Sequence, residues 1–196
     1  MAEKETSEKK KFKMDKARAL PFILTGLIIL LDQISKIIIV KNWPRVGTII
    51  KDVFNNGFLI FCHVRNPDIA FSLGRSMPGN LKPVLFIVIP VLVLGFVIWY
   101  YLKSDDFTRL QRWAVAGIIG GGIGNLIDRI FRPDGVVDFI NVKFFGLKDS
   151  FIPLLRWERW PVFNIADSSV VVCCIILMLT FIIDPIVARS KAKSKA

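Results

Sequence analysis

The sequence predicts an all-α membrane protein with four transmembrane helices and a small extracytoplasmic β-sheet. Hydrophobic residues make up 53% of the 196 residues, yet the formal net charge is +11. The mean hydropathy is +0.52. Soluble domains are also about half apolar, but they spread their charges along the chain. Here the apolar residues must gather in long runs with the charges between them, which argues against an ordinary soluble enzyme.

Four windows are long enough to span a membrane, which takes about 20 mostly apolar residues. They cover residues 20–40, 83–102, 113–130 and 169–188. The second window carries no charge inside it. Its internal Pro90 is expected to kink the helix rather than end it, because neighbouring helices can satisfy the carbonyl that proline frees.

The basic residues predict the orientation of these spans. Three segments would lie on one side of the membrane: 1–19, 103–112 and 189–196. Together they hold 14 Lys and Arg in 37 positions. The opposite side holds 11 in 80 positions, in the two long loops 41–82 and 131–168. The positive-inside rule therefore predicts both termini in the cytoplasm and both loops outside.

This orientation divides the chain into three parts. A basic cytoplasmic N-terminus (1–19) and a basic cytoplasmic tail (189–196) flank a single four-helix transmembrane domain (20–188). We interpret the basic ends as topology determinants that also contact anionic membrane lipids, and not as a nucleic-acid site. The first span lacks a small-residue cleavage site, so we expect it to be retained.

Each outer loop has about 40 residues, which is too long for a structureless connection between packed helices. Residues 57–64 form a short β-prone run after the turn signal at 55–57, and residues 136–145 form a second run that closes at Gly146. These two runs predict the small sheet on the outer face.

Polar residues inside membrane spans are costly and often functional. In the first span, Asp32 and Lys36 stand four residues apart, with the acid first, which favours a local ion pair. Such a pair is equally explained as a structural feature. In the third span, glycines at small-xxx-small spacing let another helix approach closely. That packing does not explain Asn125, Asp128 and Arg129 at its outer end.

Two further acids lie on the same outer side. Asp138 stands in an apolar, β-prone stretch, where a solvated loop acid would have polar neighbours. Asp167 begins the fourth span, where a helix N-cap is the simple explanation. Two carboxyl groups held close in a desolvated site share one proton, which is the chemistry of an aspartic hydrolase. Three cysteines and the single His63 favour neither a zinc site nor a Ser/His centre, so we expect no metal and no cofactor.

Five blocks of the sequence, in order, resemble the motifs of the lipoprotein signal peptidases, the type II signal peptidases of bacteria. The resemblance covers about residues 20–187. The blocks are DQISK (32–36), NPDIAFS (66–72), GNLIDR (124–129), VVDFI (136–140) and FNIADS (163–168).

The resemblance implies a monomeric, multi-pass aspartyl endopeptidase of the bacterial cytoplasmic (inner) membrane. It would remove the signal peptide of prolipoproteins by cleaving before a diacylglyceryl-modified cysteine near the outer leaflet. The family fold also includes a short surface helix. The resemblance implies that Asp138 and Asp167 are the catalytic dyad. It implies that four residues line the site and hold the substrate or the dyad: Asn66, Asn125, Arg129 and Asn164. It implies structural support from Asp32, Lys36 and Asp128.

Two departures from the family pattern stand out. Asp68 and Ile69 replace the usual Gly-Ala after Asn66, and residues 148–160 look like an insertion with aromatic, apolar and basic residues. We hypothesise that this insertion lies on the membrane surface and controls access to the site.

Two other functions remain as alternatives. A small proton-coupled transporter would use Asp32, Lys36, Asp128 and Arg129 as a polar path, but carriers commonly show internal repeats and this chain shows none. An inactive membrane scaffold would leave Asp138 and Asp167 unexplained.

Overall fold

The computed structural model describes residues 15–67, 81–146, 151 and 156–193. Within these ranges, four helices are long and apolar enough to cross a membrane, as the sequence predicts. Their main parts are α2 (Phe22–Asn42), α3 (Ile89–Lys103), α4 (Arg109–Phe131) and α5 (Ile165–Lys193). The second span, Val84–Lys103, also includes the turn before α3. The short helix α1 (Lys16–Ala19) precedes α2, and the π-helical turn η2 (Val84–Val88) precedes α3.

The chain stays helical across Pro90, which stands in the first turn of α3. The turn before it is π-helical, and the Ile89 amide donates to the carbonyl of Val84, five residues back. A wider turn at this point is a known way for a helix to accommodate an interruption.

Two helices begin earlier than hydropathy predicts, because polar caps extend them. The Thr108 hydroxyl accepts from the Gln111 amide at 3.3 Å, and the Gln111 side chain accepts from the Thr108 amide at 3.0 Å. This capping box starts α4 at Arg109, four residues before the predicted start. Helix α5 starts at Ile165, also four residues early, so Asp167 lies inside its first turn.

Helix α4 is the most buried of the four and packs against the other three. Its glycines allow this close packing, as predicted. A Cβ atom on Gly121 would collide with the Ala166 carbonyl of α5, and one on Gly120 would stand 3.1 Å from the backbone of Thr25 in α2. The glycines therefore let both α2 and α5 pack closely against α4.

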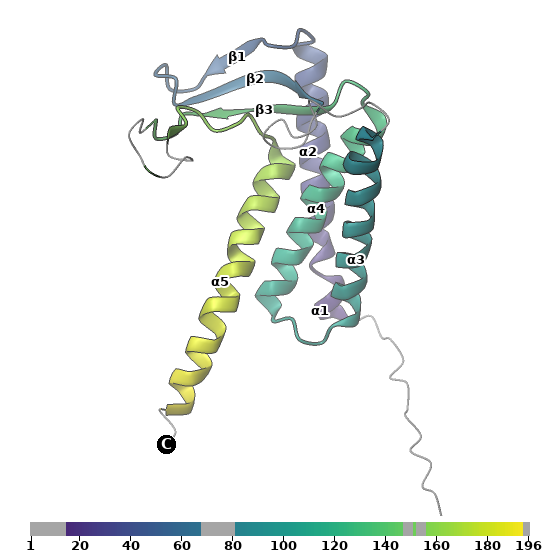
Figure 1. Ribbon diagram of the computed structural model, residues 1–196, viewed down its shortest axis with the longest axis vertical. Coiled ribbons are helices and arrows are strands. Elements are labelled where there is room, and N and C mark those ends of the chain that lie inside the picture. Colours follow the sequence, from purple (N-terminus) through teal and green to yellow (C-terminus); the bar gives the residue numbers. More distant parts are fainter. Residues whose placement is uncertain (1–14, 68–80, 147–150, 152–155, 194–196) are drawn as a thin grey trace, which may run out of the picture.

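A three-stranded antiparallel sheet lies across one end of the helices (Figure 1). Its strands, in the order β1-β2-β3, are β1 (Ile49–Asp52), β2 (Leu59–Asn66) and β3 (Val136–Val142). The sequence predicts β2 and β3 within a few residues but misses β1, whose four residues are too few for a clear alternating pattern. Buried Ile39 of α2 packs with Val137 and Phe139 of β3 and fixes the sheet to the helices.

The described end of the predicted insertion pairs with the edge of β3. The Trp160 amide donates to the Val142 carbonyl at 2.9 Å, and the Phe144 amide donates to the Glu158 carbonyl at 2.8 Å. The Arg159 guanidinium donates to the side chain of Asn141 at 2.5 Å. Residues 157–160 therefore cover this edge.

Three expectations concern parts of the chain that the structure leaves out. Asp68 and Ile69 lie outside the described residues, as do residues 148–150 and 152–155 of the insertion, so its control of access stays a prediction. Apart from α1, which lies at the end of the bundle away from the sheet, the described residues contain no separate short surface helix, and that element also stays a prediction.

Candidate active site

Asn164 and Asp167 form the start of α5 through two reciprocal hydrogen bonds. The Asp167 amide donates to Oδ1 of Asn164 at 2.9 Å, and the Asn164 amide donates to Oδ2 of Asp167 at 3.1 Å. Asn164 is therefore the helix cap, and the simple reading of Asp167 as an N-cap is wrong. Asp167 is the third helical residue, and its second carboxylate oxygen is turned toward other partners.

Asp138 lies in the middle of β3, and its residue is only 2% exposed. Its Oδ1 accepts from Nδ2 of Asn164 at 2.7 Å, and its Oδ2 accepts from Nδ2 of Asn66 at 3.2 Å. Asn66 ends the neighbouring strand β2. Gly135, directly before β3, has a φ of +98°, and a Cβ atom on it would collide with the Asn66 carbonyl. This glycine lets the chain turn tightly into β3 beside Asn66.

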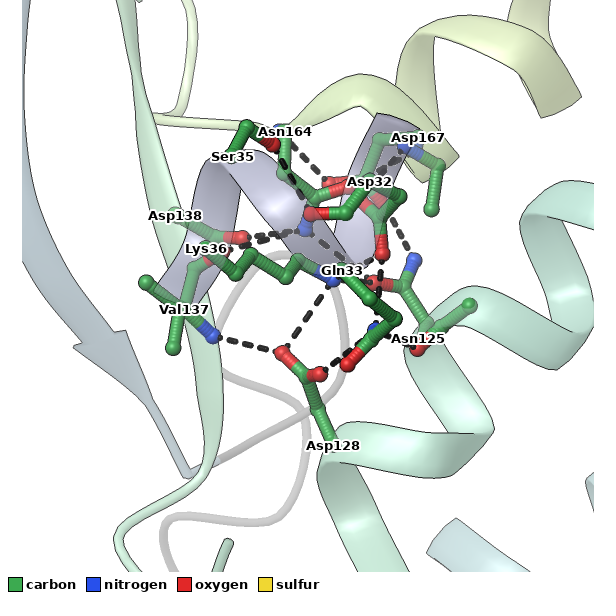
Figure 2. A network of polar contacts seen from close by, with 12 residues as sticks. Asp32, Gln33, Ser35, Lys36, Asn125, Asp128, Val137, Asp138, Asn164 and Asp167 are labelled. Carbon is green, nitrogen blue, oxygen red and sulfur yellow. Dashed lines mark hydrogen bonds and ion pairs between the residues drawn. The ribbon is translucent and has the colours of Figure 1, made fainter. Parts of the chain in front are cut away.

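Asn125 of α4 connects Asp167 to the interior of the protein. Its Nδ2 donates to Oδ1 of Asp167 at 2.7 Å, and its Oδ1 accepts from both Nζ of Lys36 and Nδ2 of Asn164 at 3.1 Å. An ammonium group can only donate, so Lys36 fixes which end of the Asn125 amide faces it. The NH₂ end must then face Asp167 (Figure 2).

Behind these residues lies a buried ion network. Nζ of Lys36 lies 2.8 Å from Asp32 and 3.1 Å from Asp128, and all three side chains are fully buried. The predicted Asp32–Lys36 pair is confirmed, and Asp128 is a second acid on the same lysine. Figure 2 shows these side chains converging from α2 and α4.

Each buried acid also holds the backbone beside one of the two cleft acids. Oδ1 of Asp32 accepts from the amide of Ala166 at 3.0 Å, directly before Asp167. Oδ2 of Asp128 accepts from the amide of Val137 at 3.0 Å, directly before Asp138. The ion network therefore sets the positions of α5 and β3 relative to each other.

Gln33 is a member of this network that the sequence reasoning missed. Its Nε2 lies 3.0 Å from the carboxylates of both Asp32 and Asp128, and its Oε1 accepts from Arg132 at 3.1 Å. Arg132 also forms an ion pair with Asp128. The available signal was an amide side chain within an apolar span, next to an acid already singled out.

The electrostatics of Asp138 favour its protonated form. Burial is the largest cause, and the negative charge of Asp167 is the next; together they raise the pKa of Asp138 from 3.8 to about 7. Hydrogen bonds from Asn66 and Asn164 and the positive charge of Lys36 oppose this rise. Near neutral pH the two acids can therefore hold one proton between them.

The two acids line one cleft of about 390 Å³ at the junction of sheet and helices. Asn66, Asn125 and Arg129 line it too, and the Arg129 guanidinium lies 5.3 Å from the centre of the Phe86 ring. The structure thus brings together the predicted site residues, with Asn164 bonded to both acids. Asp32, Lys36 and Asp128 lie behind the cleft and do not line it.

Four helices that are apolar enough to span a membrane, with two acids lining one cleft, are the features expected of a membrane-embedded hydrolase of the aspartic type. Comparison with known proteins is more specific, since the family model described as signal peptidase II matches residues 24–183. The chain belongs to this family. It is an aspartic peptidase that removes signal peptides from prolipoproteins.

Relatives agree with this family, and a solved structure shares the fold. The chain is 45% identical to a lipoprotein signal peptidase of Treponema denticola, covering 85% of this chain and 91% of that protein. It is 38% identical to the lipoprotein signal peptidase of Treponema pallidum, covering 87% of both chains. The fold is similar to a solved structure described as a bacterial membrane enzyme, with a TM-score of 0.67 and 23% identity over 85% of this chain and 90% of that one.

The transporter alternative is not supported. The family match covers nearly all of the four-helix domain. Three of the four residues proposed for a polar path, Asp32, Lys36 and Asp128, are paired with one another in the buried network. They hold the site together instead of lining a passage.

Proposed function

We propose that Asp138 and Asp167 are the catalytic dyad of this peptidase, and that it cleaves just before a diacylglyceryl-modified cysteine. The observation that carries the proposal is the position of Asn164, whose side chain bonds to Asp138 and whose backbone bonds to Asp167. The two acids thereby line one cleft with a proton available between them.

In the proposed reaction, one carboxylate takes a proton from a water molecule, and that water attacks the scissile carbonyl carbon. The other acid, protonated, hydrogen-bonds to the carbonyl oxygen as negative charge develops there. The tetrahedral intermediate collapses when the amide nitrogen receives a proton from the dyad and the C–N bond breaks. The cysteine amine and the new signal-peptide carboxyl are the products, and the dyad again holds one proton.

The side chains around the dyad have distinct proposed roles. Asn125 and Asn164 hold the carboxyl groups in position through their amide donors. Asn66 donates to Asp138 and also lines the cleft. Arg129 lines the same cleft from α4, where its guanidinium can donate to carbonyl groups of a bound peptide.

We also propose that the sheet and the cleft lie at the outer face of a bacterial cytoplasmic membrane, with both termini in the cytoplasm. The sheet stands at the end of the bundle opposite α1 and the connection between α3 and α4 (Figure 1). Segments at that opposite end carry the denser basic charge. A lipid-anchored substrate would reach the cleft from within the bilayer. One chain supplies both acids, so a monomer is sufficient.

Purified protein in liposomes, given a synthetic peptide with a diacylglyceryl-modified cysteine, provides the test. Asp138→Asn and Asp167→Asn should each lower kcat by about 10²–10⁴-fold, the usual contribution of a positioned acid or base. Asp134→Asn, at an exposed acid of the same loop, is the matched control and should cleave normally. Retained cleavage in either dyad variant, with the fold checked by thermal unfolding, would refute the assignment.

A further inference from the structure

A second, strongly apolar chamber of about 330 Å³ adjoins the catalytic cleft. Its apolar walls come from the end of β3, the segment after it and the outer face of α5. They are Val142, Phe144, Trp160, Phe163, Val171 and Val172. Three of these, Trp160, Phe163 and Val171, line the cleft as well, so chamber and cleft are continuous.

The chamber meets the cleft at Asp167, which lines both. The cleft side presents Asn66, Asn125 and Arg129, whereas the chamber side is nearly free of polar atoms. A molecule held across Asp167 would therefore place a polar portion on one side and an apolar portion on the other.

We propose that this chamber holds an acyl chain of the substrate's diacylglyceryl group while the peptide occupies the cleft that contains both acids. The proposal rests on the proposed function above. It assigns the lipid part of the substrate to a defined surface between β3 and α5.

The polar groups of the chamber argue for an acyl chain and against a peptide segment. Asp167 already accepts from Asn125 and Asn164, and the Ser168 hydroxyl donates to the Asn164 carbonyl at 2.8 Å. A peptide backbone placed there would bury amides and carbonyls without hydrogen-bond partners, which is unfavourable. An acyl chain has no such groups.

The edge of β3 is closed to an added strand at this point. The Val142 carbonyl accepts from the Trp160 amide, and the Arg159 guanidinium donates to the carbonyls of Gly57 and Asn141. Residues 157–160 therefore occupy the edge that an extended peptide would otherwise use.

The same segment gives the chamber a firm aromatic wall. The Trp160 ring lies 5.2 Å from Phe144 and 6.0 Å from Trp157, measured between ring centroids, and both pairs are edge-to-face. On the other side, Val171 and Val172 are about half exposed on α5, a membrane-spanning helix. The chamber thus borders the surface that faces lipid, from which a chain can enter sideways.

The test uses two substrates with one peptide sequence, one carrying a dipalmitoylglyceryl group on the cysteine and one a dibutanoylglyceryl group. Val172→Trp fills the chamber from α5, and Val142→Phe fills it from β3. Each should lower kcat/KM for the dipalmitoyl substrate, relative to the dibutanoyl substrate, by tenfold or more. Substrate partitioning into the membrane is the same for every variant, so this change in ratio reports the protein.

Ile175→Trp is the matched control. Ile175 lies on the same exposed face of α5, one turn beyond Val172, and it does not line the chamber. Its ratio should stay within twofold of wild type. If both chamber variants leave the ratio unchanged, or slow the two substrates equally, the acyl assignment is wrong even though the peptidase is active. A wild-type protein that cleaves neither lipopeptide would overturn the proposed function and this inference together.

Discussion

Asn164 and Asp167 exchange two hydrogen bonds across the first turn of α5, at 2.9 and 3.1 Å. The cap of this helix and the position of a proposed catalytic acid are therefore one structural feature. The side-chain Nδ2 of the same asparagine donates to Asp138 at 2.7 Å. It fixes the relative placement of a strand residue and a helix residue.

Asn164→Ser should separate capping from catalysis. Serine is also a good N-cap, so the cap should be kept, and the loss of the buried donor to Asp138 and Asn125 should lower the free energy of unfolding by about 1–3 kcal/mol. Serine lacks the amide that reaches Asp138, so kcat should fall by about 10–100-fold, an effect of lost positioning near the reacting groups. Thermal unfolding and lipopeptide cleavage measure the two effects. An active serine variant would show that the link to Asp138 is dispensable.

The raised pKa of Asp138 predicts how activity depends on pH. The proposed dyad needs one shared proton, which is lost as Asp138 ionises with a pKa of about 7. kcat/KM should therefore fall above about pH 7. A pH–rate profile with a lipopeptide substrate measures this limb. Activity that is flat up to pH 9 would contradict the shared proton.

The same pKa predicts a stability effect of Asp138→Asn. Because the folded-state pKa lies above the usual 3.8, the folded protein binds a proton that the unfolded chain lacks between about pH 4 and 7. Stability from this group is thus lost as pH rises through that window. The variant removes this loss, so its Tm relative to wild type should rise between pH 4 and 8. The corresponding free energy is at most about 4 kcal/mol. A Tm difference independent of pH would contradict the raised pKa.

Lys36→Met should be strongly destabilising, because it leaves the buried Asp32 without its cation and leaves Asp128 with Arg132 as its remaining ion-pair partner among the described residues. Removing one partner of a buried ion pair typically costs about 3–5 kcal/mol. The double variant Asp32→Asn/Lys36→Met removes one of the two charges left behind and should recover part of the loss. Thermal unfolding of the two single variants and the double variant gives the coupling energy. Additive effects would show that the network is not energetically coupled.

Gly121→Ala should disturb the contact between α4 and α5, because the added Cβ would collide with the Ala166 carbonyl. We expect a loss of about 1–3 kcal/mol and a lower kcat, since Ala166 directly precedes Asp167. Gly26→Ala is the control, because a Cβ there meets nothing within 4 Å. The control should be neutral or slightly stabilising, as Ala favours a helix more than Gly does. Equal effects of the two substitutions would rule out close packing as the cause.

Much of the fold could be predicted from local patterns. The length of the apolar windows predicted the four membrane spans, and the β-prone runs predicted strands β2 and β3. Hydropathy misplaced the start of α5 because the polar residues of its first turn read as loop. A capping pair such as Asn164 and Asp167 extends a helix into polar sequence, which a hydropathy window cannot detect.

The contacts of the candidate site were harder to predict from local patterns than the helices and strands were. Asp138 and Asp167 were predicted because acids among apolar residues are unusual. The local pair of Asp32 with Lys36 was predicted too, but the bond of Asp32 to the Ala166 amide was not, since it joins residues 134 positions apart. No local spacing contains that contact. The role of Gln33 likewise depends on α4 lying beside α2.

The hydrogen bond from Ala166 to Asp32 joins the last membrane helix to the first full one. Helices that enter a bilayer in the order of translation would leave Asp32 without this partner until the final span arrives. Both proposed catalytic acids then come together in one closing step of biogenesis. If Asp138 and Asp167 act as proposed, a chain whose last span has not yet been inserted would lack an assembled dyad.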